Sequence, residues 1–459
     1  MDSPESPSPV VEDDSEEFEC EQKRLLDVQR QSRDPALLIS SSRTLMNILK
    51  CMVGPGCFAL PVSFQMAGLW VSHTELYQVG LSMIFFVGFS SAYCMLMLVE
   101  AAQYLCRKSG RLELDYGHLA KKAFDYSTPA FQKHSKGALY VTNTLIAAFQ
   151  LGVCSVQIVF LVTHLKEIVE FYVNMQPLSS FIYSTIVLLL ILPVCLIRHL
   201  KSLTPLIAVA NAFMLLTFFA IFQKIVLPPN HIASLPGYTN FNGFLLAAGS
   251  MLYAFEGQAV ILPLENKMKH PEDLLGWNGV LSVSMTIVTA VYAATGFFGY
   301  ATFGDEVKGS ITLNMPQTWI YDAVKVMLMI AVFLGYPVQL YVVTAMLWPG
   351  IKRKVNVSNE RNLLLLELTV RAVLVCTTYV LAIAIPNLEK IIPFVGVTAG
   401  MFLGFVFPPS ISIIAYAEDV YRMSRPVKYW FFAKNIFFIC LGIVGTVAGL
   451  YANLLNIFK

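Results

Sequence analysis

A Gly-Pro-Gly triplet interrupts one long apolar stretch of this chain. It is Gly54-Pro55-Gly56, followed by Cys57, within an apolar segment that runs from Leu45 to Leu69. Glycine is a poor helix former, and proline lacks an N–H and clashes with the preceding turn, so we expect a helix to break there. Past such a break, the free N–H groups and the positive dipole end of the second half-helix can bind a carboxylate. A proline kink with tight glycine packing is the alternative interpretation.

A second interruption, Tyr253-Ala254-Phe255-Glu256-Gly257, lies in another apolar segment far downstream. Unwound carbonyl groups in this segment could accept hydrogen bonds from an ammonium group. Phe255 could close over a small side chain, although ordinary packing is the usual role of an isolated aromatic ring. Glu256 is the most informative charge, because an acid at mid-membrane is costly and is a functional hypothesis by default. It is a candidate to carry a proton or to pair with an amine; a structural ion pair is the alternative.

Polar side chains inside other apolar segments are further candidates to line a binding cavity. Asn143, Gln150 and Gln157 recur at helical spacing, and Tyr336 lies in a later apolar segment. For any one of them, interhelical hydrogen bonding is the simpler interpretation. A pair of broken helices in corresponding halves of a chain is, however, the best sequence indication of a transporter's substrate site. We therefore include Asn143, Gln150 and Tyr336 among the substrate-binding candidates.

The elements that position these residues are predicted to be membrane helices. The chain has 459 residues, of which 56% are hydrophobic and 14% charged, with a mean hydropathy of +0.62. Soluble domains carry about 25% charged residues, so we predict an all-α polytopic membrane protein in contact with the lipid bilayer. The net charge of +2 gives no indication of nucleic-acid binding. No pattern predicts a metal site or a cofactor, and the motifs of common hydrolases are absent, so we do not expect an enzyme.

A membrane helix needs about 20 mostly apolar residues, and by that rule we predict about eleven spans. They lie near Leu45–Leu69, Leu76–Cys106, Leu139–Phe171, Ser180–Ile197, Leu203–Val226, Phe241–Leu264, Leu274–Phe303, Trp319–Pro349, Leu363–Ile385, Ile391–Tyr416 and Phe431–Ile457. The interruptions fall in the first and sixth spans. This spacing predicts a LeuT-type inverted repeat of five plus five helices, with one repeat over about 43–226, the other over about 241–416, and an additional C-terminal helix over about 431–457.

The first 42 residues have a different composition from the transmembrane domain over 43–459. They form an acidic tail rich in serine and proline, which cannot bury a core and should be disordered. The tail contains two acidic dileucine patterns, which sorting adaptors read as addresses. Their residues are Glu21, Leu25 and Leu26 in the first, and Asp34, Leu38 and Ile39 in the second. These patterns are short and common by chance; they favour an endosomal or lysosomal location as strongly as the plasma membrane.

Basic residues in the loops predict the orientation of the chain. Lysine and arginine gather in alternate loops, and the intervening loops contain only Lys308 and Lys390. By the positive-inside rule, the N-terminus is predicted to be cytoplasmic. With an odd number of spans, the C-terminus is then extracellular or luminal.

Several motifs together resemble a known family. These are the segment from Thr44 to Lys50 leading into the Gly-Pro-Gly triplet, the Phe255-Glu256-Gly257 triplet, and the specific block from Leu262 to Pro271. In them the chain resembles the proton-coupled amino-acid transporters, the PAT branch of the amino acid/auxin permease superfamily, over everything after the tail. The resemblance implies transport of small neutral amino acids, in many members with protons, at the plasma membrane or the lysosome.

One departure from that family bears on coupling. Asn47 stands where the proton-coupled members typically have a histidine, and asparagine does not titrate whereas histidine does so near neutral pH. We therefore assign Asn47 and Glu256 as the positions that decide coupling. Proton symport through Glu256, uniport and exchange remain open. The runner-up function is a sensor, which would bind amino acids with little flux and signal from an endolysosomal membrane through the cytosolic tail.

Overall fold

The structure is a computed structural model, and it describes residues 38–68, 79–173, 178–197, 200–226, 235, 239–255, 257–355, 360–421 and 423–458. Over these ranges the chain is helical, and its only β-type pairing is an isolated bridge between Ile39 and Met268. The predicted class, an all-α polytopic membrane protein, is confirmed.

The predicted number of spans is close to the number found. Nine of the described helices are long and apolar enough to cross a membrane, and a tenth span is obtained if a bent pair is counted as one. That pair is Ser41–Met52 (α2) with Pro55–Ala67 (η2 and α3), bent by 45°. The remaining predicted span forms Ser180–Cys195 (α8), an apolar helix of 16 residues that is shorter than the usual length for a span.

The bounds of the elements follow chain order, with η marking 3-10 and π helices. After α2, η2 (Pro55–Ala59) and α3 (Leu60–Ala67), they are α4 (Val79–Ser109), α5 (Tyr116–Asp125), α6 (Pro129–Gln132), α7 (Ser135–Val173), α8, α9 (Leu200–Val226), α10 (Phe241–Ala254), α11 (Gln258–Glu265), η4 (Pro271–Leu274), α12 (Val280–Phe303), η5 (Gly304–Glu306), η6 (Ile311–Asn314), α13 (Trp319–Lys354), α14 (Glu360–Ala384), α15 (Leu388–Val395), η7 (Gly396–Gly400), η8 (Phe402–Val406), α16 (Phe407–Ala415), η9 (Asp419–Tyr421) and α17 (Arg425–Phe458).

Contacts between distant segments define two ends of the bundle. At one end, which we call the tail side, the backbone N–H of Ile39 donates to the carbonyl of Lys267 (2.9 Å), just past α11. At the other end, which we call the η6 side, the Gln65 side chain near the end of α3 donates to the carbonyl of Asp305 in η5 (2.9 Å). Successive long helices run between these two sides.

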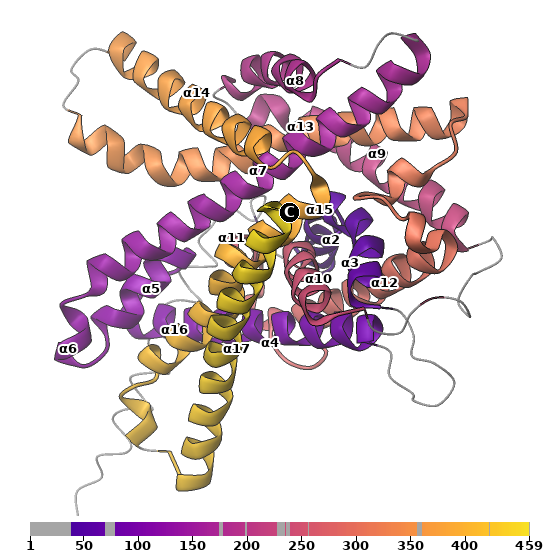
Figure 1. Cartoon of the computed structure of the whole chain (residues 1–459). Coiled ribbons are helices and arrows are strands. Elements are labelled where there is room, and N and C mark those ends of the chain that lie inside the picture. Colours follow the sequence, from indigo (N-terminus) through magenta and orange to yellow (C-terminus); the bar gives the residue numbers. More distant parts are fainter. Residues whose placement is uncertain are drawn as a thin grey trace, which may run out of the picture.

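The interrupted helices lie at the centre of the bundle. In Figure 1, α2, α3 and α10 are surrounded by other helices, whereas α8 and α14 lie at the periphery. Helix α10 contacts α3, α15 and η7. A π segment is a local widening that is frequent at functional sites, and η7 begins at Gly396, where a side chain would overlap the carbonyl of Gly249 in α10. Glycine at these positions allows the two backbones to pack in direct contact.

Candidate functional site

The first helix breaks where the Gly-Pro-Gly triplet predicts. Helix α2 ends at Met52, and Gly54 has an extended backbone (φ −132°, ψ −165°) before the 3-10 turn η2 begins at Pro55. The axis changes direction by 45° across this gap. Proline at the first position of η2 has no N–H to leave unpaired, which suits a helix start. The sequence alone therefore located this break correctly.

The sixth predicted span also breaks at its predicted position. Helix α10 ends at Ala254, and α11 begins at Gln258, with Gly257 between them in a non-helical conformation (φ −142°, ψ −5°). A side chain at Gly257 would overlap Met52 at the end of α2. Glu256, the coupling candidate, lies outside the described residues. The geometry of this second break is therefore described from Phe255 and Gly257, the residues on either side of Glu256.

The two breaks lie against each other. A Cβ atom at Gly56 would be 3.3 Å from the ring of Tyr253 and 3.4 Å from the Cα of Ala254. Real Cβ contacts are rarely that short, so glycine at position 56 is what permits this close approach. Residues almost 200 positions apart in the sequence thus form one junction. We call it the break junction and define it by Met52–Cys57, Tyr253–Phe255 and Gly257.

Tyr292 of α12 ties the two halves of the break junction together. Its hydroxyl is within hydrogen-bonding reach of the carbonyl of Ala254 (3.0 Å) and of the carbonyl of Met52. These are the last helical residues before each break. Carbonyls at helix ends have no partner within the helix, and the single hydroxyl of the fully buried Tyr292 is shared between these two. The sequence analysis missed Tyr292, because nothing local to position 292 points to a junction formed by other helices.

Two candidates on the break junction pack against α12 or α4. Cys57 is fully buried, and its Sγ lies 3.6 Å from the hydroxyl of Thr295. Phe255 is also fully buried, and its ring centroid is 5.0 Å from that of Tyr292. A side chain at Gly88 of α4 would meet the Phe255 ring at 2.9 Å. In this conformation Phe255 is thus a packing residue between α12 and α4.

Gln150, one of the polar candidates on α7, directly follows a residue that packs on the break junction. Its neighbour Phe149 places its ring 6.4 Å from that of Tyr253, centroid to centroid. Gln150 is buried, and its side-chain oxygen has no hydrogen-bond partner among the described residues. Leaving a buried acceptor unpaired costs roughly 1–3 kcal/mol, which a bound ligand could recover.

Asn143 and Tyr336 have partners elsewhere. Asn143 packs on Gly117 of α5, where a side chain would overlap its amide oxygen. The Tyr336 hydroxyl lies 2.6 Å from the hydroxyl of Thr378, which joins α13 to α14. Tyr336 therefore makes the interhelical hydrogen bond that we gave as the simpler interpretation, and Asn143 makes an interhelical packing contact with α5.

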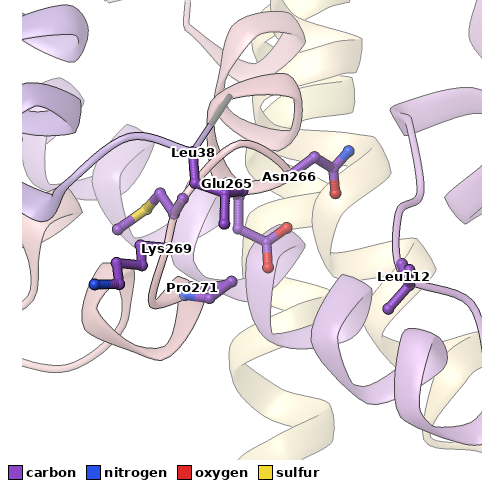
Figure 2. Close-up of a pocket in the computed structure, with 7 residues that line it drawn as sticks. Leu38, Leu112, Glu265, Asn266, Lys269 and Pro271 are labelled. Atoms are coloured by element: carbon purple, nitrogen blue, oxygen red, sulfur yellow. The ribbon is translucent and has the colours of Figure 1, made fainter. Parts of the chain in front are cut away.

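The described end of the tail lies on the tail side of α11. Ile39 both donates to Lys267 and accepts from the N–H of Lys269, at 2.9 Å each, and the Ser41 hydroxyl donates to the carboxylate of Asp273 (2.7 Å). Figure 2 shows the small crevice at this contact, which is lined by Leu38, Leu112, Glu265, Asn266, Met268, Lys269 and Pro271. The other sorting candidates, Glu21, Leu25, Leu26 and Asp34, lie outside the described residues.

Comparison with known proteins identifies the family of this chain. The family model described as "Transmembrane amino acid transporter protein" matches residues 39–455. The chain belongs to this family. Among its relatives, the probable amino acid transporter skat-1 of Caenorhabditis elegans is 36% identical over 91% of this chain and 90% of the relative. The proton-coupled amino acid transporter-like protein pathetic of Drosophila melanogaster is 28% identical over 93% of this chain and 87% of the relative.

Family membership confirms the resemblance drawn from the motifs. The match covers both interrupted helices and ends within α17, so the break junction lies inside the family's shared region. The described residues contain no group of three histidine, cysteine, aspartate or glutamate side chains placed to hold a metal ion.

Proposed function

We propose that this member of the family is a secondary transporter of small neutral amino acids that works by alternating access, and not an enzyme. The observation that carries the proposal is the contact of Gly56 with Tyr253 and Ala254, since it puts two helix breaks at one place. There, half-helix N-termini would bind the substrate carboxylate, and unwound carbonyls would bind its ammonium group. We propose Gln150, whose buried side-chain oxygen has no hydrogen-bond partner among the described residues, as a further ligand of this ammonium group.

The packing at the junction supports a small substrate. Gly56 and Gly257 leave no room for larger side chains at the junction, and Phe255 and Tyr253 fill the adjacent space. A transporter built this way would accept alanine, glycine or proline before any bulky amino acid. We further propose that residues 43–226 and 241–416 form inverted repeats of the LeuT type, that the N-terminus is cytoplasmic, and that the C-terminus is extracellular or luminal.

Uptake by the purified protein in proteoliposomes tests this function. Radiolabelled alanine, glycine and proline should accumulate above the level of protein-free liposomes, and an excess of unlabelled substrate should compete with the label. Saturable binding without accumulation would contradict transport and would support the sensor function instead.

The sensor is the second candidate because the tail is attached to the transport domain. Ile39 and Ser41 form hydrogen bonds with residues that follow α11. Movement of the second broken helix would therefore displace the cytosolic tail through these bonds. We propose that sorting adaptors read the Leu38-Ile39 signal only when this contact opens, at an endosomal or lysosomal membrane. Deletion of residues 1–37 would abolish signalling by a sensor and leave uptake by a transporter intact.

Replacement of Glu256 by glutamine tests proton coupling. Glutamine has nearly the same shape but cannot carry a proton, so we expect uptake by this variant that does not vary with pH. The unmodified protein should take up substrate faster when the pH falls on the substrate side. Glu306→Gln, at an exposed position in η5, is the matched control and should keep the normal profile. Unchanged pH dependence in Glu256→Gln would contradict the proposed role.

Replacement of Asn47 by histidine tests the other coupling position. Asn47 is half-buried on α2, six residues before Val53, where the non-helical linker begins, and thus about 9 Å from it along the helix axis. A titratable group there should strengthen the dependence of uptake on an inward proton gradient. The measurement is the ratio of uptake with and without the gradient, with Asn47→Gln as the neutral control. Equal ratios in the two variants would show that the family's histidine position does not transfer to this chain.

A further inference from the structure

A groove outside the break junction lies between α4 and α12. It has a volume of about 510 Å³ and is lined by residues of these two helices and of the loop that precedes α12. Phe89 of α4, in the groove, is 54% exposed, and Ile287 of α12, beside it, is 40% exposed. Outward-facing apolar side chains of this size mark a surface that contacts membrane lipid. The groove therefore opens to the bilayer.

Trp277 indicates the depth of the groove in the membrane. It is 97% exposed, lines the groove, and lies in the loop before α12, four residues after the tail-side contact of Asp273. Tryptophan is enriched at the membrane–water interface, at the level of the lipid headgroups. The end of the groove at Trp277 thus lies at headgroup depth, and its apolar wall, which includes Phe89 and Met285, extends toward the hydrocarbon. A polar end joined to an apolar wall matches the two parts of a single phospholipid.

Glu100 is the charged residue of this groove. Its side chain is exposed on α4 and lines the groove. Its carboxylate forms no hydrogen bond or ion pair with another residue that the structure describes. A carboxylate that faces a bilayer without a partner is costly. The N–H groups of a lipid ammonium are a partner that the bilayer itself supplies.

Lys434 of α17 places the opposite charge at the edge of the groove. Its Nζ donates to the hydroxyl of Tyr93 (3.0 Å), and Tyr93 lines the groove. Lys434 and Glu100 interact electrostatically across this edge, but the bond to Tyr93 holds the ammonium short of a direct ion pair. An ammonium has three donors, so two of them are left for an anionic oxygen such as that of a phosphate.

We propose that this groove binds one phospholipid whose headgroup carries a phosphate and a primary amine, as in phosphatidylethanolamine. Lys434 binds the phosphate, Glu100 binds the ammonium, and an acyl chain lies along Phe89 and Met285. A two-carbon bridge separates the two charges of this headgroup, so the headgroup spans the gap between Glu100 and Lys434. A choline headgroup has no N–H to donate, and a glycerol headgroup has no positive charge, so both leave the Glu100 carboxylate unpaired.

Native mass spectrometry of the purified full chain tests the proposal without requiring transport. The protein is titrated with phosphatidylethanolamine, phosphatidylcholine and phosphatidylglycerol that carry identical dioleoyl chains. We expect the first phosphatidylethanolamine to bind about tenfold more tightly than either of the others, the difference that one charge-assisted hydrogen bond supplies. Glu100→Gln should remove this preference. Glu272→Gln, at a largely exposed acid of the tail side that does not line the groove, is the matched control and should keep it.

Replacement of Lys434 by methionine tests the phosphate contact. All three lipids contain a phosphate, so the variant should bind each of them about tenfold less tightly. Lys428→Met, six residues earlier on α17 and not part of the groove, should leave all three affinities unchanged. Equal weakening by the two variants would contradict a phosphate contact at Lys434.

A variant that fills the groove keeps the test decisive if a charge variant does not fold. Thr286 is exposed in the groove, and its hydroxyl bonds the carbonyl of Ser282 in its own helix. Thr286→Trp should therefore abolish the preference while both charges are retained, and Ile287→Trp, at the next position, should not. Equal affinities for the three lipids in the starting protein, tighter binding of phosphatidylcholine, or an unchanged preference in Glu100→Gln or Thr286→Trp would overturn the proposal.

Discussion

Replacement of Tyr292 by phenylalanine is expected to lower uptake by on the order of 100-fold while the protein still reaches the membrane. The ring packing on Phe255 is kept (5.0 Å between centroids), and only the hydroxyl shared by Met52 and Ala254 is lost. A buried carbonyl without a partner costs roughly 1–3 kcal/mol, and two are affected here. An uptake loss of that size corresponds to about 2.7 kcal/mol in the barrier, within this range.

The same helix offers a matched control for this prediction. The hydroxyl of Tyr300, two turns further along α12, is buried and has no hydrogen-bond partner among the described residues. Tyr300→Phe removes the same atom from the same element without orphaning a carbonyl, so it should be neutral or slightly stabilising. Initial uptake rates and thermal unfolding of both variants in detergent make the comparison. Equal losses in the two variants would mean that the Tyr292 hydroxyl has no special role at the break junction.

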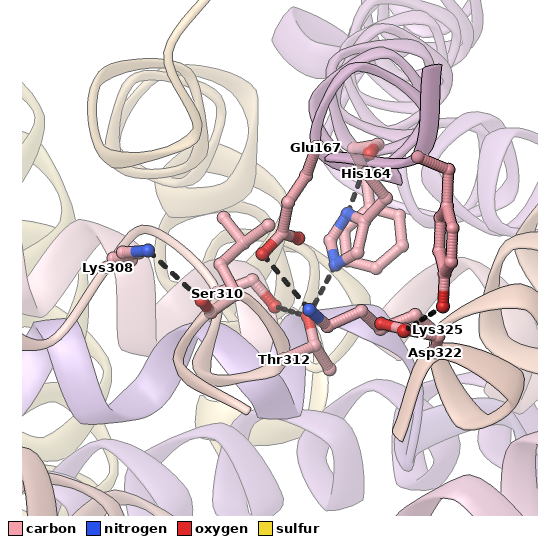
Figure 3. Close-up of polar contacts among 10 residues, drawn as sticks. His164, Glu167, Lys308, Ser310, Thr312, Asp322 and Lys325 are labelled. Atoms are coloured by element: carbon pink, nitrogen blue, oxygen red, sulfur yellow. Dashed lines mark hydrogen bonds and ion pairs between the residues drawn. The ribbon is translucent and has the colours of Figure 1, made fainter. Parts of the chain in front are cut away.

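Replacement of Lys325 by methionine should destabilise the protein by about 3 kcal/mol, the lower end of the range for breaking buried pairs, because it leaves the carboxylate of Glu167, which is only 18% exposed, without its counter-charge. Figure 3 shows this pair at the η6 side of the bundle; Lys325 is 1% exposed, and its ammonium is 3.0 Å from that carboxylate. The double variant Lys325→Met/Glu167→Gln removes both charges, so it should recover most of the loss. Thermal unfolding followed by size-exclusion chromatography measures these differences as shifts in Tm.

An exposed ion pair provides the comparison for this second prediction. Lys108 and Glu418 are closer together, at 2.6 Å, but their side chains are 27% and 57% exposed. Exposed pairs contribute about 0–1 kcal/mol, so Lys108→Met should shift Tm far less than Lys325→Met. If the two single variants shift Tm equally, or if the double variant is no more stable than Lys325→Met, burial of the Lys325–Glu167 pair is not what stabilises this end of the bundle.

The sequence by itself determined the class of fold, the family and the position of both helix breaks. These follow from local properties. Composition and the length of apolar stretches predict membrane helices, and Pro55 with its flanking glycines cannot continue a helix. The second break was located from Phe255-Glu256-Gly257, and α10 ends one residue before that triplet. The π segments η7 and η8 were not predicted, because they leave no mark on hydrophobic periodicity.

Only the tertiary structure decided which residues meet. Gly56 contacts Tyr253 and Ala254 because the first and sixth spans pack together, and no local pattern specifies that pairing. The same reason applies to Tyr292, whose hydroxyl serves carbonyls on two other helices, and to His164, whose partner Thr312 is 148 residues away. Sequence patterns fix the conformation of each segment through backbone sterics and hydrophobicity. Partners are fixed by packing between segments, where the need to satisfy every buried polar group selects one arrangement.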